Sequence, residues 1–261
     1  MKPLERLFER DGLPGFDLPA GLAALYGGDF GFARPRVYAN FVSSLDGVVA
    51  LAGAGESGQR VSGGSEPDRF LMGLLRATAD AVLIGAGTFR KIARALWHAE
   101  DIYPPAAELF AELRAQLGLR RHPLLVVVTA SGEIDPQQPA LRDALIVTTP
   151  AGEARLRGTL PPGARVVAPD AARVSPRVLL DLLHADGLQA ILTEGGPSVL
   201  GELLEAGLVD ELFLTTAPRL FGRAPGDGRK SLVDGVDLGG QPLGLASVRR
   251  HESYLFLRYV R

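Results

Sequence analysis

The chain has 261 residues, a formal net charge of -2 at pH 7, 46% hydrophobic residues and no cysteine. This composition supports a packed core, and the lack of cysteine excludes disulfides, thiol nucleophiles and cysteine-ligated metals. A nucleic-acid-binding domain is normally basic, so the charge argues against a nucleic-acid partner. No apolar run approaches the about 20 residues of a membrane span, and the N-terminus lacks the pattern of a signal peptide. We therefore expect a cytoplasmic protein with no membrane partner.

Residues 1–35 are rich in glycine and proline, and we expect an irregular lead-in there. Residues 36–51 predict a strand that is broken by the turn dipeptide Asp46-Gly47. Ser65 followed by Asp68 is typical of a capping box and predicts a helix start. Further helices are predicted within residues 106–118, 175–187 and 197–206, and buried strands within 80–88, 124–136, 143–150, 164–169, 190–193 and 211–218. The alternation in residues 254–260 predicts a more exposed or edge strand.

Strands that are uniformly Val, Ile and Leu and that alternate with helices indicate a mostly parallel sheet covered on both faces. We therefore predict an α/β fold with a mostly parallel central sheet flanked by helices and with antiparallel strand structure at the C-terminal end. No repeat or linker divides the chain, so residues 36–261 are expected to form a single domain after the lead-in.

Five short loops follow predicted strands, and each is built from Gly, Ser, Thr or an acidic residue. Parallel strands present their carboxyl ends to ligands at one edge of the sheet. The pattern therefore predicts a crevice lined for a polar, phosphate-bearing ligand. The five loops are Ser43–Gly47, Gly85–Thr88, Thr129–Gly132, Thr148–Pro150 and Glu194–Ser198.

The segment "TEGGPS" carries the sharpest signal among these loops. Gly195 and Gly196 leave the backbone bare, and Pro197 suits the first position of a helix whose free N–H groups bind anions. The glycines also have a purely structural reading, since the turn itself favours them. Glu194 ends a buried run, where it accepts hydrogen bonds from a ligand or caps the helix. Asp46 allows the same two readings, binding or turn formation.

Other motifs are weaker. "GAGTFR" has Arg90 where a dinucleotide fingerprint needs its third glycine. His98-Ala-Glu100 matches half of a zinc deaminase signature, but that chemistry uses cysteine ligands, and four scattered histidines predict no metal site. No G-x-S-x-G elbow of a serine hydrolase is present. The basic residues beside the glycine-rich loop after residue 218 contact a phosphate or are simply solvated; they are Arg219, Arg223, Arg229 and Lys230.

Three segments together resemble a known family: "ANFVSSLDG", "LLRATADAVLIGAGT" and "ILTEGGPSVLGELLEAGLVDELFLTTAPRLFG". They are similar to the reductase domain of riboflavin biosynthesis, the RibD C-terminal family, which is related in fold to dihydrofolate reductase. The resemblance covers residues 36–261. It implies NADPH-dependent reduction of a ribosylamino-pyrimidine phosphate, with hydride transfer to ribose C1 in a homodimer. The chain would be a reductase without the zinc deaminase to which it is often fused.

The resemblance also implies roles for particular residues. Glu194 matches the acid that contacts the pyrimidine, Arg76 a basic residue near the substrate, and Asn40 a position where many members have lysine. Residues 196–202 match the loop that binds the NADPH pyrophosphate, and Thr88 matches a threonine at the cofactor. The expected substrate contacts are Asn40, Ser44, Arg76 and Glu194, and the expected cofactor contacts are Gly85, Gly87, Thr88, Thr129, Ser131, Thr148, Gly195, Gly196, Pro197, Ser198, Val199 and Leu200.

The proton donor and the 2′-phosphate site are less defined by sequence. Asp46, Asn40 or a water molecule delivers the proton in this reading, with Glu194 orienting the pyrimidine. Ser131, together with Thr129 or Thr148, is the candidate for binding the 2′-phosphate. The predicted catalytic residues are Glu194, Asp46 and Asn40.

The chain departs from the family after Thr88, where many members continue with Asp-Asp-Pro. Here Phe89–Pro104 reads "FRKIARALWHAEDIYP", which leaves recognition of the substrate phosphate to Arg90, Lys91 or Arg94. Three alternatives therefore stay open: a reductase of the same fold for dihydrofolate or a pterin, a non-catalytic nucleotide-binding protein, and a zinc hydrolase suggested by His98-Ala-Glu100.

Overall fold

A computed structural model describes residues 1–53, 57–92 and 95–261. Ten strands form one sheet in the order β1-β9-β10-β8-β2-β7-β3-β4-β5-β6. From β8 to β6 all neighbours are parallel, while β10, β9 and β1 add antiparallel pairs at the other end. The α/β prediction is confirmed. The strands are β1 (Glu5–Glu9), β2 (Arg36–Ser44), β3 (Ala81–Gly85), β4 (Leu124–Val128), β5 (Leu145–Val147), β6 (Arg165–Val167), β7 (Ala190–Thr193), β8 (Glu211–Ala217), β9 (Gly244–His251) and β10 (Tyr254–Val260).

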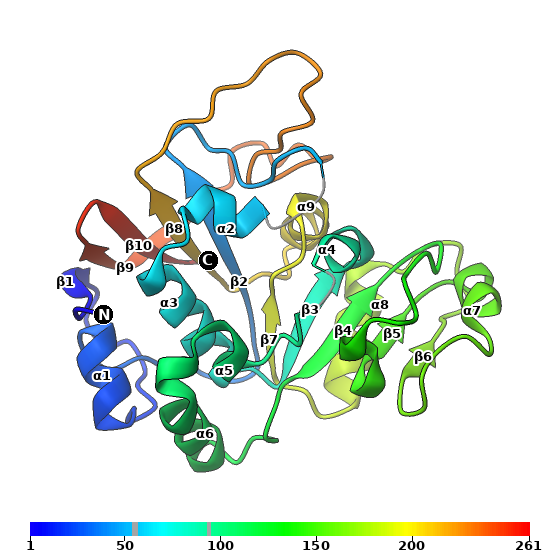
Figure 1. Cartoon of the computed structure of the whole chain (residues 1–261), viewed down its shortest axis with the longest axis horizontal. Coiled ribbons are helices and arrows are strands. Elements are labelled where there is room, and N and C mark those ends of the chain that lie inside the picture. The colour runs from blue at the N-terminus through cyan, green and yellow to red at the C-terminus, as the bar shows by residue number, and fades with distance from the viewer. Residues whose placement is uncertain (54–56, 93–94) are drawn as a thin grey trace.

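Helices cover both faces of the sheet (Figure 1). One core cluster joins α1, α3 and α6 to the sheet, with Phe70, Leu74 and Phe110 fully buried. The other cluster joins α8 and α9 to the opposite face. The helices are α1 (Ala20–Tyr26), α2 (Ser57–Ser62), α3 (Glu66–Ala77), α4 (Ala86–Lys91), α5 (Ala99–Ile102), α6 (Ala107–Gln116), α7 (Pro150–Leu156), α8 (Pro176–Ala185) and α9 (Pro197–Glu205), with short 3-10 turns at Pro104–Ala106 and Pro139–Asp143.

The predicted helix boundaries follow from capping. The Ser65 hydroxyl accepts a hydrogen bond from the Asp68 backbone N–H at 3.4 Å, which confirms the start of α3. Gly207, at φ 69°, lies just beyond α9 in the left-handed conformation that ends a helix. Helix α7 was not predicted, although the Thr149 hydroxyl caps it by accepting from the Gly152 N–H at 3.1 Å.

The expectation of an irregular lead-in is wrong, because residues 1–35 contain β1 and α1. Buried Arg249 of β9 docks both elements. Its Nη2 donates to Glu9 Oε2 at 2.6 Å, and its Nε donates to the Tyr26 carbonyl at 2.8 Å. Its guanidinium also lies 3.7 Å from the centre of the Tyr26 ring. A partner more than 200 residues away in sequence therefore gives this glycine- and proline-rich segment its structure. The single-domain assignment of residues 36–261 stays a prediction.

Strand β10 is also not at an edge, because it lies between β9 and β8. The other predicted alternative, a more exposed strand, is confirmed. Phe256 and Arg258 are buried on one face, whereas Leu257 faces the less covered side of the sheet. Strand β9 was not predicted.

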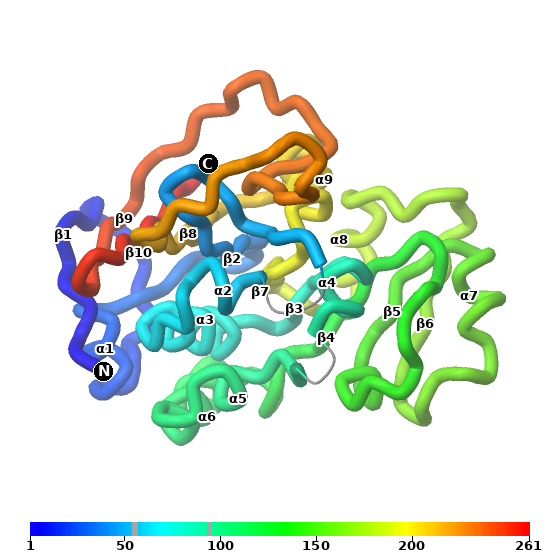
Figure 2. Tube along the Cα trace, turned by 45° about the horizontal axis from the view of Figure 1, so that its top comes forward, coloured from blue at the N-terminus to red at the C-terminus, as the bar shows by residue number. Residues whose placement is uncertain are grey.

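The carboxyl ends of β2, β7 and β8 gather at one edge of the sheet with segments distant in sequence. Figure 2 shows residues 218–243 passing over this edge near α9 and the turn that follows β2. Backbone hydrogen bonds between Lys230 and Ala50 hold that loop to the segment after β2. Among the helices of residues 1–53, 57–92 and 95–261, none combines the length and apolarity needed to cross a membrane.

Candidate active site

The polar residues at this edge lie on the sheet face that α3 covers. Glu194 extends the β7 ladder, since its N–H donates to the Leu83 carbonyl at 3.1 Å. Successive side chains of a strand alternate between faces, so a residue two positions after a core side chain lies on the core side. Asn40, Glu194 and Thr215 each come two positions after such a residue, namely Tyr38, Leu192 and Phe213.

Arg76, in the last turn of α3, forms a two-pronged ion pair with Glu194. Arg76 Nε donates to Glu194 Oε1 at 2.9 Å, and Nη2 donates to Oε2 at 2.6 Å. The two side chains are 7% and 9% exposed, so the pair is shielded from water. The remaining Arg76 nitrogen, Nη1, donates to the His98 carbonyl at 3.3 Å. A bidentate pair of this kind fixes the carboxylate plane in space. The structure thus brings together two of the predicted substrate residues, 118 positions apart.

Asp68 lies on the same side of α3, two helical turns before Arg76. Asp68 is 6% exposed, and burial raises the pKa of its carboxyl to about 6, although the neighbouring Thr215 hydroxyl acts in the opposite direction. The negative charge of Glu194 acts in the same direction as burial. Sequence reasoning used Asp68 only as part of the capping box. Its spacing of eight residues from Arg76 was the available signal, because positions i and i+8 lie within the same broad stripe of a helix.

Asn40 and Ser44 differ in what they are free to do. Asn40 is 8% exposed, and its side chain makes no hydrogen bond within the ranges that the structure describes. It is therefore available for a ligand. The Ser44 hydroxyl donates to Asp46 Oδ1 at 2.6 Å and accepts from the Val48 N–H at 2.9 Å. These bonds organise the turn after β2.

Asp46 clamps the loop after β8. Its Oδ2 accepts from the Gly222 N–H at 2.6 Å, and both of its oxygens lie 3.3 Å from the Phe221 N–H. The hydrogen bond from Ser44 lowers the pKa of the Asp46 carboxyl, and these backbone donors add to the effect. A carboxyl with a lowered pKa carries no proton to deliver near neutral pH, so the structure favours a structural role for Asp46 over the predicted catalytic one.

The start of α9 meets the loop after β3. Gly196 is the N-cap and offers no side chain, and the N–H groups of the first turn have no acceptor within the helix. A Cβ atom at Gly196 would lie 3.3 Å from the Thr88 hydroxyl, and one at Gly85 would lie 2.8 Å from a Val199 methyl carbon. Four of the predicted cofactor positions, Gly85, Thr88, Gly196 and Val199, are therefore neighbours around a bare stretch of backbone.

The other predicted cofactor residues separate by exposure. Thr148 and Leu200 are 0% exposed, so their side chains do not reach a ligand in this structure. The reason is packing: Leu200 belongs to the core beneath α9, and Thr148 lies directly against Gly152. Gly87 is exposed and Pro197 is buried. The Ser198 hydroxyl donates to Asp234 Oδ2 at 3.4 Å, and the Gly195 N–H donates to the Thr193 hydroxyl at 3.3 Å.

The loop after β4 is shaped by its own side chains. The hydroxyl of buried Thr129 accepts from the Gly132 N–H at 3.1 Å, which leaves it little freedom to bind a ligand. Ser131 is exposed, and its hydroxyl accepts from the Glu133 N–H at 3.3 Å. Of the three residues predicted to bind a 2′-phosphate, only Ser131 is accessible.

The segment that replaces Asp-Asp-Pro has its own packing. Trp97 is 2% exposed, stacks on Phe89 with ring centres 5.8 Å apart, and has a positive φ of 58°. Arg90 Nη1 donates to the Glu133 carbonyl at 2.7 Å, so this guanidinium is already engaged. Lys91 is exposed, and Arg94 lies outside the described residues.

The sequence predicted that the four histidines are scattered, but two of them lie together. The rings of His98 and His122 stack with centres 3.9 Å apart and planes 16° apart. Burial, followed by the adjacent His122, lowers the pKa of His98, although Asp101 and Glu100 oppose the shift. Sequence reasoning missed the pair because His122 is 24 positions away, in the turn before β4.

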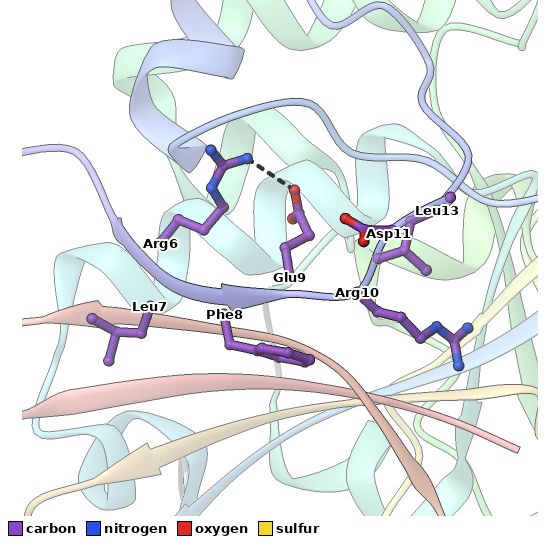
Figure 3. A pocket seen from close by; sticks show the side chains of 8 residues that line it. Arg6, Leu7, Phe8, Glu9, Arg10, Asp11 and Leu13 are labelled. Atoms are coloured by element: carbon purple, nitrogen blue, oxygen red, sulfur yellow. Dashed lines mark hydrogen bonds and ion pairs between the residues drawn. The ribbon is translucent and has the colours of Figure 1, made fainter.

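A separate hollow of about 480 Å³ runs along the edge strand β1 and is lined by residues 6–13 (Figure 3). Figure 3 shows Leu7 and Phe8 on one side of the strand and Glu9 on the other, where it pairs with Arg6. None of these residues belongs to the predicted site, which lies at the carboxyl ends of the parallel strands.

Comparison with known proteins identifies the family. The model of the RibD C-terminal domain matches residues 35–252. The chain is 30% identical to the 2,5-diamino-6-ribosylamino-4(3H)-pyrimidinone 5′-phosphate reductase of Archaeoglobus fulgidus over 72% of this chain and 83% of that protein. It is also 30% identical to the enzyme of the same name from Methanothermobacter thermautotrophicus, over 77% and 85%.

A solved structure agrees. The pyrimidine reductase-like protein of Corynebacterium diphtheriae superposes with a TM-score of 0.68 at 28% identity, over 87% of this chain and 91% of that chain. The resemblance found in the sequence is confirmed, and the chain belongs to the RibD C-terminal domain family.

Proposed function

We propose that the protein is an NADPH-dependent reductase of a ribosylamino-pyrimidine phosphate in riboflavin biosynthesis. The reaction delivers hydride to ribose C1 and opens the sugar to a ribityl chain. The observation that carries the proposal is the shielded Arg76–Glu194 pair beside Asp68 and Asn40, at the strand edge where α9 begins. The relatives from Archaeoglobus and Methanothermobacter are named as reductases of such a substrate.

Glu194 is suited to hold the heterocycle. A carboxylate offers about four lone-pair sites, and Arg76 takes two of them. The other two accept adjacent N–H donors of a pyrimidine ring. The diamino-pyrimidinone named for the relatives presents an amino group at position 2, whereas its deaminated uracil counterpart presents a carbonyl oxygen there. The substrate assay therefore compares both compounds.

The residues at the start of α9 fit the pyrophosphate of a dinucleotide. Free N–H groups attract the anion, and the half-buried N-cap Gly196 has no side chain to block its approach to the backbone. Thr88 flanks this stretch, and Ser131 is the accessible hydroxyl for a 2′-phosphate. When bound, the nicotinamide supplies the hydride, and the protein has to place ribose C1 about 3–3.5 Å from it.

Asp68 replaces Asp46 as our candidate proton donor. Opening the ribose breaks the bond between C1 and the ring oxygen, and this oxygen then needs a proton. A general acid works best with a pKa near the working pH, and burial raises the pKa of Asp68 to about 6. Asp46 has a lowered pKa and clamps a loop.

The test is NADPH consumption with the diamino-pyrimidinone phosphate, its uracil counterpart and dihydrofolate in parallel. We expect oxidation with at least one of the two pyrimidines and none with dihydrofolate. Oxidation with dihydrofolate alone would move the protein to another heterocycle. Tight NADPH binding without oxidation by any of the three would make it a non-catalytic nucleotide-binding protein.

The homodimer implied by the family has a candidate interface on the open face of the antiparallel strands. Five apolar side chains form one row there, because each is the register partner of the next: Phe8, Val248, Leu257, Leu214 and Phe41. Phe8 is 44% exposed, and Leu245 on the same side of the sheet is 38% exposed. A second copy would cover this apolar row, which water otherwise meets.

The interface is tested by light scattering coupled to size-exclusion chromatography. We expect a dimer for the native chain and a monomer for Leu257→Asp, which puts a charge in the middle of the row. Val178→Asp changes an apolar residue of α8 that is 40% exposed and serves as the matched control. A dimer that persists in Leu257→Asp would place the interface elsewhere. A cytoplasmic location stays a prediction.

A further inference from the structure

His98, Glu100 and His122 form a cluster that the reductase chemistry does not use. Each offers one ligand atom, and these three atoms lie within 4.8 Å of one another. The residues come from the start of α5 and from the turn before β4, so the fold rather than the local sequence assembles them. His98-Ala-Glu100 drew attention as half of a metal motif, and His122 supplies a third ligand that the sequence did not show.

The spacing of the cluster is close to that of a tetrahedral metal site. Zinc bonds to nitrogen and oxygen are about 2.0–2.2 Å, which puts neighbouring ligand atoms about 3.4 Å apart. His122 Nδ1 and Glu100 Oε1 are already 3.2 Å apart. The widest allowed separation of 4.8 Å has to shrink by about 1.4 Å for a metal to bind. The stacked rings of His98 and His122 also have to tilt out of their near-parallel planes, because a metal lies in the plane of each imidazole that binds it.

Two further contacts favour a metal over a plain hydrogen bond. His122 Nδ1 is inaccessible to water, yet it makes no hydrogen bond of acceptable geometry within the described residues, despite its distance to Glu100. His98 Nδ1 lies 3.1 Å from Asp101 Oδ2. Metal-binding histidines commonly donate their second ring nitrogen to a carboxylate in this way, which fixes the ring for the metal.

Access to the cluster is open. The side chains of His98, Glu100 and His122 are 24%, 32% and 32% exposed, so rotation of these side chains, without unfolding of the segment, is enough to bring the covered His122 Nδ1 to an ion. Two imidazoles and one carboxylate suit Zn²⁺ and its neighbours in the transition series better than Mg²⁺ or Ca²⁺, which prefer oxygen ligands. Three protein ligands leave one position for water.

We propose that His98, Glu100 and His122 form a binding site for a divalent transition metal ion of the Zn²⁺ type. The ion joins the start of α5 to the turn before β4. The site is linked to the Arg76–Glu194 pair, because the carbonyl of His98 accepts a hydrogen bond from Arg76 Nη1. The proposal does not depend on the reductase activity, since it concerns residues outside the substrate and cofactor positions.

The test is direct metal binding to the full chain, without a histidine tag and after treatment with a chelator. ZnCl₂ titration by calorimetry is expected to show one equivalent bound, and CoCl₂ should give the visible absorbance of tetrahedral cobalt. His122→Ala and Glu100→Gln are each expected to weaken zinc binding at least about 100-fold, because even loss of an outer carboxylate costs about 10–100-fold. Asp101→Asn should cause a loss of about 10-fold.

His184→Ala and His251→Ala remove the other two histidines and serve as matched controls. Both are expected to bind zinc as the native chain does, and circular dichroism checks that every variant is folded. Less than about 0.2 equivalents of zinc on the native chain would overturn the proposal, leaving two histidine–carboxylate contacts without a metal. Equal losses in the control variants would also overturn it.

Discussion

Replacing Asp68 by Asn tests the central electrostatic feature of the site. In the native protein burial raises the pKa of Asp68 from 3.8 to about 6, a difference that corresponds to about 3 kcal/mol. Between these two values the folded state binds more protons than the unfolded state. The free energy of unfolding therefore falls as the pH rises through this window, and the penalty is fully present above pH 6.

Asn does not titrate, so Asp68→Asn escapes that penalty. The measured quantity is the free energy of unfolding of Asp68→Asn minus that of the native protein. This difference should rise by about 2 kcal/mol from pH 4 to pH 8, because part of the 3 kcal/mol penalty is already present in the native protein at pH 4. Urea denaturation of both proteins at the two pH values measures this difference, and all other titrating groups cancel. A difference below about 0.5 kcal/mol would refute the idea that Asp68 is desolvated.

Asp46→Asn is the matched control, with the opposite sign. The pKa of Asp46 is lowered, so its carboxylate contributes stability above the pKa of the unfolded state and loses it as the pH falls through the folded value. The control should therefore destabilise the protein at pH 8 more than at pH 4. In the NADPH assay, Asp68→Asn should lower kcat about 100-fold or more with little change in NADPH affinity, whereas unchanged kcat would exclude Asp68 as the proton donor.

Three further predictions concern the neighbourhood of the site. Arg76→Met should lower the free energy of unfolding by about 3–5 kcal/mol by leaving Glu194 buried without its partner, and adding Glu194→Leu should restore much of it in urea denaturation. Gly196→Val should weaken NADPH binding in a fluorescence titration, since a Cβ atom there already lies 3.3 Å from the Thr88 hydroxyl; unchanged affinity would remove Gly196 from the cofactor site. Gly73→Ala should cost about 1–3 kcal/mol by thermal unfolding, because its Cβ atom would lie 2.7 Å from the ring of Phe110 in α6, and a neutral effect would show that this contact yields easily.

Local patterns were enough to predict much of the framework. The capping signal at Ser65 and the helix stop at Gly207 depend on neighbouring backbone groups, and the structure has both. The apolar runs predicted the parallel strands, because a strand in a parallel sheet is covered on both faces and is therefore apolar at nearly every position. The segment from Glu194 to Pro197 identified the end of β7 and the start of α9, because glycine and proline restrict or free the backbone dihedral angles at their own positions.

The same local reasoning failed where a distant partner decides the structure. Residues 1–35 carry a strand and a helix because Arg249 docks them, and no pattern within the segment reports that partner. The dipeptide Asp46-Gly47 left a site role and a structural role both open, because the partners of its carboxylate, backbone N–H groups 175 positions away or more, are not visible in the local sequence.

The sequence by itself determined the alternation of strands and helices, the bare backbone at the start of α9 and the place of a carboxylate, Glu194, directly after β7. The role of Glu194 in the site stays a prediction. Only the tertiary structure decided that Glu194 is paired with Arg76, that Asp68 has a raised pKa beside them, and that His98 meets His122. The physical reason is that propensity and capping act within a few residues. Burial, charge pairing and pKa instead depend on whichever side chains the fold brings together.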